Sequence, residues 1–243
     1  MRFAYLIEPP FNDRDSTGAV IGHDVEIARA LFDDLGKDFE PVETEFAELL
    51  PGVADGRWHM TTGLFATAER TQLAAFTHPI WALPDGLLVA RGNPLGLTGY
   101  RSLAFHDTAR IAVIRDQVQH HSAIAFGVTE SRIAIFDTYP EAARAVIEGR
   151  ADAYASVARA HKGFLATQPN VEADVVTISA DEKPPASGAF AVSLGDEALL
   201  SRINAFLVGF LGSQAHRSIA ERHGFSEEEV DLVAGSGGND LNL

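Results

Sequence analysis

LLPGVADGRWHMT, residues 49–61, and PEAARAVIEGRADAYAS, residues 140–156, repeat one pattern along the chain. In both stretches a short helical segment runs into Gly-Arg, at positions 56–57 and 149–150, and an apolar strand follows. Alternating helices and strands are typical of α/β domains, in which helices cover the sheet. The repeat therefore predicts two α/β lobes of similar plan.

The residues before the first stretch extend it into a β-α-β-α-β order. A strand at the very start runs into a Pro-Pro turn at positions 9–10, and a polar hairpin then leads to a helix. We expect Asp24 to cap this helix, because a carboxylate accepts hydrogen bonds from the first free amides. Gly36 is the expected stop, and a strand follows near residues 40–46. This order predicts a mostly parallel sheet flanked by helices.

The second stretch is preceded by the same alternation. Residues 109–114 form an apolar strand, and a helix that we expect to be capped by Asp116 comes next. Another strand is expected at residues 133–136. The fold class is therefore α/β, with each lobe a mostly parallel sheet flanked by helices.

Two segments are candidates for the crossings between the lobes. Residues 86–94 form an apolar strand that ends in Gly and Pro, and residues 183–192 begin with Lys-Pro-Pro. Two crossings place the second lobe, residues 92–186, inside the first, residues 1–91 and 187–243, with a two-strand hinge.

The C-terminal part of the chain is expected to be helical and to belong to the first lobe. Helices are predicted at residues 196–211 and 214–223, and a further helix starts at Ser226. The tail from Gly235 onward is Gly-rich, and we expect it to be disordered.

The composition excludes several classes of partner and site. The formal net charge of −15 argues against nucleic acid and anionic membranes as partners, because phosphate binding needs clustered Lys and Arg. The chain has no cysteine, and its nine histidines show no metal-ligand spacing, so we expect neither a metal nor a cofactor. Residues 1–7 lack the features of a secretion leader. Either a leader has been removed, or the protein is made without one.

Short motifs follow one another in a fixed order. They are Pro9-Pro10-Phe11, Gly22-x-Asp24, Leu49-Leu50-Pro51-Gly52, Thr61-Thr62-Gly63-Leu64-Phe65-Ala66-Thr67-Ala68-Glu69-Arg70, Phe76-Thr77-His78-Pro79 and Gly149-Arg150-Ala151-Asp152-Ala153. Together they resemble the amino-acid-type extracellular solute-binding proteins of ABC importers, often called solute-binding family 3. The resemblance covers nearly the whole chain. It implies a two-lobed type II periplasmic-binding-protein fold that closes around a small solute.

The resemblance implies that Arg70 grips the carboxylate of the ligand. A planar guanidinium suits this task, because it gives two parallel charge-assisted hydrogen bonds and never deprotonates. The alternative is a surface arginine in a salt bridge with Glu69 or Asp33.

Other candidates in the first lobe could contact the rest of the ligand. Phe65 stands where many amino-acid binders have a hydroxyl residue, and its flat face suits stacking or a cation–π contact. Glu8 could meet a cation of the ligand, or it could be a solvated turn carboxylate. The remaining first-lobe candidates are Phe11, Tyr5, Gly63 and Trp81. For Phe65 and Trp81 the alternative is a packing role in the interior.

In the second lobe the resemblance points to the strand-to-helix turn at residues 114–119. Relatives have a glycine and a hydroxyl residue there, whereas this chain has Asp116 and Val118. The expected contacts are Arg115, Gln117 and Gln119.

The acid that commonly holds the α-ammonium of amino acids is missing, because the chain reads Ser156-Val157 at that place. Either Glu8 takes over that task, or the ligand has no primary α-amine. The set Glu8, Phe11, Phe65 and Arg70 resembles the pocket of ectoine-type compatible-solute receptors. The resemblance thus implies a compact zwitterion as ligand, an ABC permease as partner, a monomer, and no catalysis.

Two alternatives belong to other classes. Cyclohexadienyl dehydratases resemble these receptors, and Glu8 or Asp152 would then be the general acid. A leaderless cytoplasmic solute sensor is the other alternative. The expected location depends on whether a leader was removed. The protein is periplasmic or extracytoplasmic if a leader was removed, and cytoplasmic if Met1 is the native start.

Overall fold

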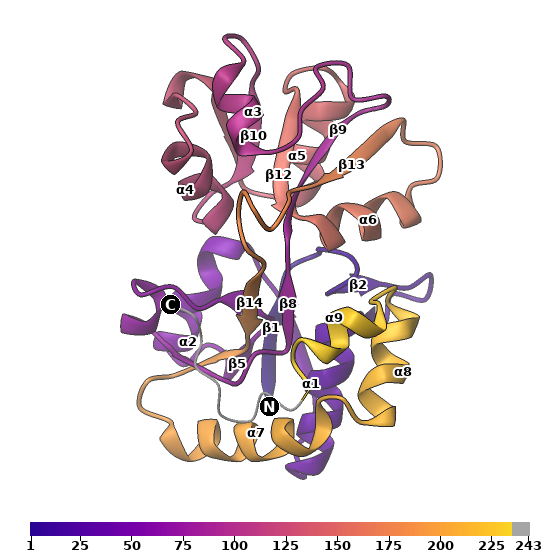
Figure 1. Ribbon diagram of the computed structural model, residues 1–243. Coiled ribbons are helices and arrows are strands. Elements are labelled where there is room, and N and C mark those ends of the chain that lie inside the picture. The colour runs from indigo at the N-terminus through magenta and orange to yellow at the C-terminus, as the bar shows by residue number, and fades with distance from the viewer. Residues whose placement is uncertain (235–243) are drawn as a thin grey trace. The chain divides into compact units, whose positions relative to one another are not determined.

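The computed structural model describes residues 1–234 and divides into two compact units (Figure 1). Unit 1 consists of Met1–Ala82 and Ala186–Leu243, and unit 2 is Leu83–Pro185. The chain thus passes between the units twice. The sequence placed the first boundary later, after Arg91, because the strand at Asp85–Ala90 was taken as part of the crossing. The tail expected to be disordered from Gly235 lies outside the described residues.

Unit 1 contains a five-stranded sheet of order β4-β1-β5-β15-β7. Its strands are β4 (Glu40–Glu43), β1 (Arg2–Tyr5), β5 (Met60–Thr61), β15 (Ala191–Val192) and β7 (Ala75–Phe76). A smaller sheet joins β6 (Leu64–Phe65), β14 (Ala186–Ala189) and β8 (Trp81–Leu83), and β2 (Asp13–Arg14) pairs with β3 (Val20–Ile21). The helices are α1 (His23–Asp34), α2 (Leu49–Ala54), α7 (Glu197–Phe210), α8 (Gln214–Arg222) and α9 (Glu227–Asp231), with single 3₁₀ turns at Phe46–Glu48 and Arg70–Gln72.

Unit 2 contains a second five-stranded sheet, of order β11-β10-β12-β9-β13. Its strands are β11 (Ile133–Phe136), β10 (Ile111–Ile114), β12 (Ala153–Val157), β9 (Asp85–Ala90) and β13 (Ala173–Thr177). The helices are α3 (Tyr100–Phe105), α4 (Val118–Ala125), α5 (Tyr139–Ile147) and α6 (Ala158–Thr167), with a 3₁₀ turn at Glu130–Arg132.

Both sheets are mostly parallel, as predicted, with one strand in each running against the other four. The three strands built by alternation with helices are parallel, namely β4-β1-β5 in unit 1 and β11-β10-β12 in unit 2. The strands next to the crossings run the other way, since β15 is antiparallel to β5 and β7, and β9 is antiparallel to β12 and β13. Helical crossovers return the chain in the same direction, whereas a strand entering from the other unit is free of that constraint.

The repeated Gly-Arg motif ends a helix in the same way in both units. Gly56 and Gly149 each have φ of 71°, a left-handed conformation that glycine adopts without strain. The amide of Arg57 donates to the Gly52 carbonyl, and the amide of Arg150 donates to the Ala145 carbonyl. These are Schellman closures, which satisfy the last free carbonyls of α2 and α5.

Two predicted helix caps are wrong. The residue at the start of α1 is Gly22, without a side-chain cap, and the carboxylate of Asp24 instead accepts hydrogen bonds from Thr62 and Gly63. In unit 2, Gln117 precedes α4, and Asp116 has φ of 62°. Asp116 therefore occupies the left-handed position before the helix, a conformation that Asp tolerates better than most residues.

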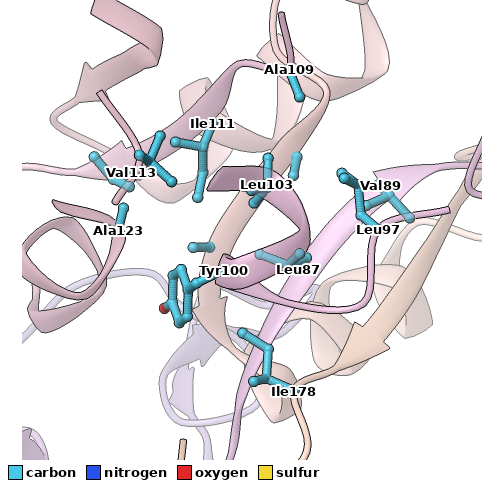
Figure 2. Packing of buried hydrophobic residues seen from close by; sticks show 13 residues of the cluster. Leu87, Val89, Leu97, Tyr100, Leu103, Ala109, Ile111, Val113, Ala123 and Ile178 are labelled. Carbon is cyan, nitrogen blue, oxygen red and sulfur yellow. The ribbon is translucent and has the colours of Figure 1, made fainter. Parts of the chain in front are cut away.

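Each unit has its own apolar core. In unit 1 the cluster lies between the sheet and α2 and includes Ala4, Leu49 and Leu64. In unit 2, Leu87, Tyr100 and Ile111 pack with their neighbours, as Figure 2 shows. In the part of the chain that the structure describes, no helix combines the length and apolar character needed to cross a bilayer.

Candidate functional site

Trp81 is the centre of an aromatic group in unit 1. Its ring lies 5.3 Å from the ring of Phe11 and 5.3 Å from that of Phe65, centroid to centroid, and it is 4% exposed. Two glycines make room for the indole. A Cβ at Gly188 would lie 2.1 Å from the ring, and a Cβ at Gly63 would lie 2.7 Å from Nε1. The indole is thus fixed by packing. Within residues 1–234, its Nε1 has no hydrogen-bond partner.

Arg70 is joined to the same group through the backbone of Phe65. It begins the 3₁₀ turn that follows β6, and its Nη1 donates to the Phe65 carbonyl at 3.0 Å. The guanidinium carbon lies 5.2 Å from the centre of the Phe46 ring, a cation–π contact. The side chain is partly buried, so its guanidinium is oriented by unit 1 itself.

Glu8 belongs to a tight turn that carries Phe11. The Glu8 carbonyl accepts hydrogen bonds from the amides of Phe11 and Asn12, and the Glu8 side chain is 9% exposed. The turn sits on the first residues of α1, because the amides of His23 and Asp24 donate to the carbonyls of Pro10 and Phe11. These carbonyls satisfy helix-start amides that a side-chain cap would otherwise satisfy.

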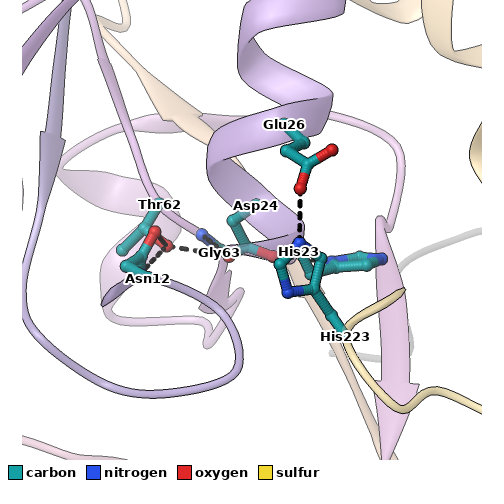
Figure 3. Close-up of polar contacts among 7 residues, drawn as sticks. All are labelled: Asn12, His23, Asp24, Glu26, Thr62, Gly63 and His223. Carbon is teal, nitrogen blue, oxygen red and sulfur yellow. Dashed lines mark hydrogen bonds and ion pairs between the residues drawn. The ribbon is translucent and has the colours of Figure 1, made fainter. Parts of the chain in front are cut away.

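Asp24 links this turn to the strand pair that carries Phe65 (Figure 3). Its Oδ2 accepts from the Thr62 hydroxyl at 2.8 Å and from the Gly63 amide at 2.9 Å. The Asn12 side-chain amide donates to the same Thr62 hydroxyl at 2.8 Å. All three side chains are buried, and a buried network of this kind holds its members in one arrangement.

Tyr5 was expected to reach the ligand with its ring. The structure places this side chain, 0% exposed, next to the edge strand β4, where its hydroxyl donates to Glu43 at 3.3 Å. Arg14 covers the ring, and burial, together with Glu43, raises the pKa of Tyr5. None of these contacts involves the aromatic group around Trp81.

The three unit-2 candidates lie around the predicted turn, but their side chains are in different surroundings. Arg115 is half exposed and pairs with Asp137 at 2.9 Å. Gln119 is 2% exposed, and its Nε2 donates to Asp85 at 2.9 Å. Gln117 is 5% exposed, and its Oε1 accepts no hydrogen bond from residues 1–234. Among the three unit-2 candidates, Gln117 is thus the one with a buried side-chain oxygen that lacks a partner in the described part of the chain.

A polar cluster around Asp85 was not anticipated from the sequence. This carboxylate, 2% exposed, accepts from the Tyr100 hydroxyl at 2.6 Å, from Gln119, and from the Lys183 ammonium at 2.5 Å. In the sequence Asp85 follows Pro84 and precedes Gly86, which is typical of an exposed turn. No local signal distinguishes it from a solvated aspartate.

The alternative general acid, Asp152, has a structural role. Its carboxylate accepts a hydrogen bond from the Arg110 amide at 2.8 Å, and its own amide donates to the Arg110 carbonyl. Asp152 therefore fixes the approach of the chain to β10 and β12. Among the described residues, no three His, Asp or Glu side chains are grouped to hold a metal ion.

Comparison with known proteins gives the family. The sequence model of the bacterial extracellular solute-binding proteins, family 3, matches residues 1–226. The probable amino-acid ABC transporter periplasmic-binding protein y4tE of Sinorhizobium fredii (strain NBRC 101917 / NGR234) is 28% identical over 236 residues, which cover 93% of this chain and 77% of that protein.

Solved structures agree with this match. EhuB, crystallised in complex with hydroxyectoine, has a TM-score of 0.84 and 26% identity, covering 95% of this chain and 90% of its own. An ancestral arginine-binding protein bound to glutamine has a TM-score of 0.83 at 21% identity, covering 93% of this chain and 97% of its own, and is similar in fold. The chain therefore belongs to the bacterial extracellular solute-binding proteins, family 3, and has their type II periplasmic-binding fold.

Proposed function

We propose that this chain is the substrate-binding receptor of an ABC importer and that its solute is a compact zwitterion, with a carboxylate at one end and a cation at the other. One observation carries the proposal. In unit 1, Arg70 is oriented by the Phe65 carbonyl and the Phe46 ring, beside the aromatic group of Phe11, Phe65 and Trp81.

Arg70 is assigned to the carboxylate of the solute. A guanidinium and a carboxylate form paired charge-assisted hydrogen bonds, which are about twice as strong as neutral ones. Orientation by unit 1 in advance reduces the entropy that is lost when the solute binds.

The aromatic group and Glu8 are assigned to the cation. Aromatic faces attract a cation, most strongly where water is excluded. Phe11 and Phe65 are both more than nine-tenths buried, and Glu8 adds a carboxylate on the turn that carries Phe11. From unit 2, we assign Gln117 to the solute, because its buried side-chain oxygen accepts no hydrogen bond within residues 1–234.

A cation other than a primary α-ammonium fits the residues best. Val157, where related receptors carry an acid, is 6% exposed and ends β12 without offering a charge. The likeness to EhuB, which was crystallised with hydroxyectoine, supports a ring-borne, delocalised cation. We accordingly place the receptor outside the cytoplasm, with an ABC permease as its partner.

A thermal-shift screen over ectoine, hydroxyectoine, glycine betaine, L-arginine and L-glutamine tests the proposal. A solute present at about 100 times its dissociation constant adds roughly 2.7 kcal/mol to the free energy of unfolding. We expect the ectoines to raise the melting temperature most. A shift with the L-amino acids alone would show that the delocalised cation is wrong. No shift with any zwitterion, or turnover of a prephenate-like acid, would overturn the receptor assignment.

A further inference from the structure

His23, the first residue of α1, is buried and contacts both its neighbour Asp24 and Phe225, which comes from the C-terminal part of unit 1. Its Nδ1 lies 2.9 Å from Oδ1 of Asp24, so that nitrogen carries the proton donated to the carboxylate. Its ring stacks on Phe225, with centroids 4.1 Å apart and an interplanar angle of 22°. Phe225 lies between α8 and α9, in the C-terminal part of the chain.

The first contact leads to Gly63. Oδ1 of Asp24 is occupied by His23, so Oδ2 is directed to Thr62 and Gly63, at 2.8 Å and 2.9 Å (Figure 3). Gly63 in turn lies directly against the indole of Trp81, since a Cβ there would come within 2.7 Å of Nε1. A shift of the Asp24 carboxylate would therefore move the backbone on which the indole rests.

The second contact leads to Phe11. The ring of Phe225 meets the ring of Phe11 edge to face at 5.9 Å, and the ring of Phe11 lies 5.3 Å from that of Trp81. Phe225 and Phe11 are 8% and 4% exposed, so this row of rings is part of the interior. Close-packed interiors transmit displacements, because no empty space absorbs them.

We propose that His23 is a positioning residue for the solute site, holding Gly63 through Asp24 and Phe11 through Phe225. Gly63 and Phe11 both pack against Trp81, so one buried imidazole sets the place of the indole from two directions. The inference rests on the proposed function, since it gives Trp81 and Phe11 a part in binding the solute. It makes the C-terminal segment at Phe225 a support of the site.

Two substitutions separate the two contacts. His23→Asn keeps a side-chain N–H near the position of Nδ1 and removes the ring from Phe225. His23→Phe keeps a ring on Phe225 and removes the donor to Asp24. Leu31→Ala is the matched control, because Leu31 is a fully buried residue of the same helix that belongs to the apolar core. We expect it to loosen α1 and to leave both contacts in place.

The readout is the fluorescence of Trp81. The chain has two tryptophans, so a Trp58→Phe background leaves Trp81 as the single reporter. Emission is recorded without solute, and the dissociation constant for hydroxyectoine is measured by isothermal titration calorimetry on the same samples. We expect both His23 variants to shift the emission maximum and to bind at least about tenfold more weakly, which corresponds to about 1.4 kcal/mol. Leu31→Ala should lower the melting temperature and change neither the emission nor the affinity.

Unchanged emission in both His23 variants would overturn the inference, and so would a shift in emission with unchanged affinity. If the background protein binds no hydroxyectoine, the proposed solute is wrong, while the solute-free emission still decides whether His23 positions Trp81. Should the His23 variants fail to fold, Phe225→Leu breaks the second contact alone. An unshifted Trp81 emission in Phe225→Leu would then contradict the inference.

Discussion

Asp24 in unit 1 and Asp85 in unit 2 are both buried, but different groups surround their carboxylates. Asp24 accepts hydrogen bonds from the Thr62 hydroxyl, the Gly63 amide and His23. Asp85 accepts from the Tyr100 hydroxyl, the Gln119 amide and the Lys183 ammonium. One of the donors to Asp24, Gly63, lies directly against Trp81. The donors to Asp85 come from two helices and from the segment that leads out of unit 2.

The difference assigns the two carboxylates different tasks. Asp85 follows the first crossing of the chain, and Lys183 precedes the second, so their ion pair joins both ends of the inserted unit. Burial and the nearby Asp85 carboxylate raise the pKa of Tyr100 well above its usual value, which keeps its hydroxyl a donor. Asp24 shapes the candidate site, whereas Asp85 holds unit 2 together.

The largest effect on the free energy of unfolding is expected for Asp85→Ala. Removing the carboxylate from a buried ion pair and two hydrogen bonds should lower the free energy of unfolding by about 3–5 kcal/mol. Urea unfolding measures the loss, and hydrogen exchange should locate it in β9 and α3 of unit 2. Asp137→Ala, which breaks an exposed pair, is the control. A loss no larger than that of the control would contradict the role given to Asp85.

Both units also bury a histidine that stays neutral, so acid should destabilise each unit. Burial lowers the pKa of His161 in unit 2 to about 3 and the pKa of His216 in unit 1 to about 4. In the unfolded chain both imidazoles take up a proton near pH 6.5, so below that pH the unfolded state binds more protons. The free energy of unfolding should therefore fall as the pH drops from about 6.5 towards these folded values, by about 2 kcal/mol per histidine at about pH 5.

Urea unfolding at about pH 7.5 and about pH 5 measures this dependence. His161→Gln cannot take up the proton, so it should lose less stability between the two conditions than the unmodified protein. Equal losses would show that His161 is not responsible.

A smaller loss of stability is expected for Gly188→Ala in unit 1. The added Cβ would meet the Trp81 ring at 2.1 Å, so the indole must move, at a cost of about 1–3 kcal/mol. Solute binding should weaken with it. Gly209→Ala is the control, because nothing lies within 4 Å of a Cβ at this position in α7. Alanine there should stabilise the protein by up to about 1 kcal/mol. If Gly188→Ala is as stable as the control, Trp81 is not held by packing.

The smallest effect on stability and on solute affinity is expected for Arg115→Ala. Arg115 and Asp137 are each more than half exposed, and such pairs contribute about 0–1 kcal/mol. The variant should unfold like the unmodified protein and bind the solute about as tightly. A large loss of affinity would bring Arg115 into the site.

The sequence predicts the local parts of this structure well. The strands and helices that were predicted appear in the expected order, and Gly36 ends α1 as expected, whereas α3, α6 and β13 were not predicted. The cap assigned to Asp24 is wrong because its partner Thr62 lies 38 residues away. The cluster at Asp85 is missed for the same reason, as its partners lie 15, 34 and 98 residues away.

The candidate site was likewise predicted in part. The motif that ends in Arg70 gave its candidate residues through resemblance, and the structure brings Phe11, Gly63, Phe65 and Trp81 together. Tyr5 was a candidate because it lies on the first strand, where the period of two puts it on the same face as Phe3 and Ile7, yet its hydroxyl is directed to Glu43. Periodicity gives the face of a strand, but the partner of a polar group depends on neighbouring elements that a short window does not contain.

Isothermal titration calorimetry of Arg70→Ala tests the central claim most directly. The titrant is the zwitterion that gives the largest thermal shift with the unmodified protein, and Arg115→Ala is measured beside it. Loss of paired charge-assisted hydrogen bonds should weaken binding by at least about 100-fold, or about 3 kcal/mol, while the circular dichroism spectrum stays the same. An Arg70→Ala variant that binds as tightly as Arg115→Ala would contradict the assignment of Arg70 to the carboxylate of the solute.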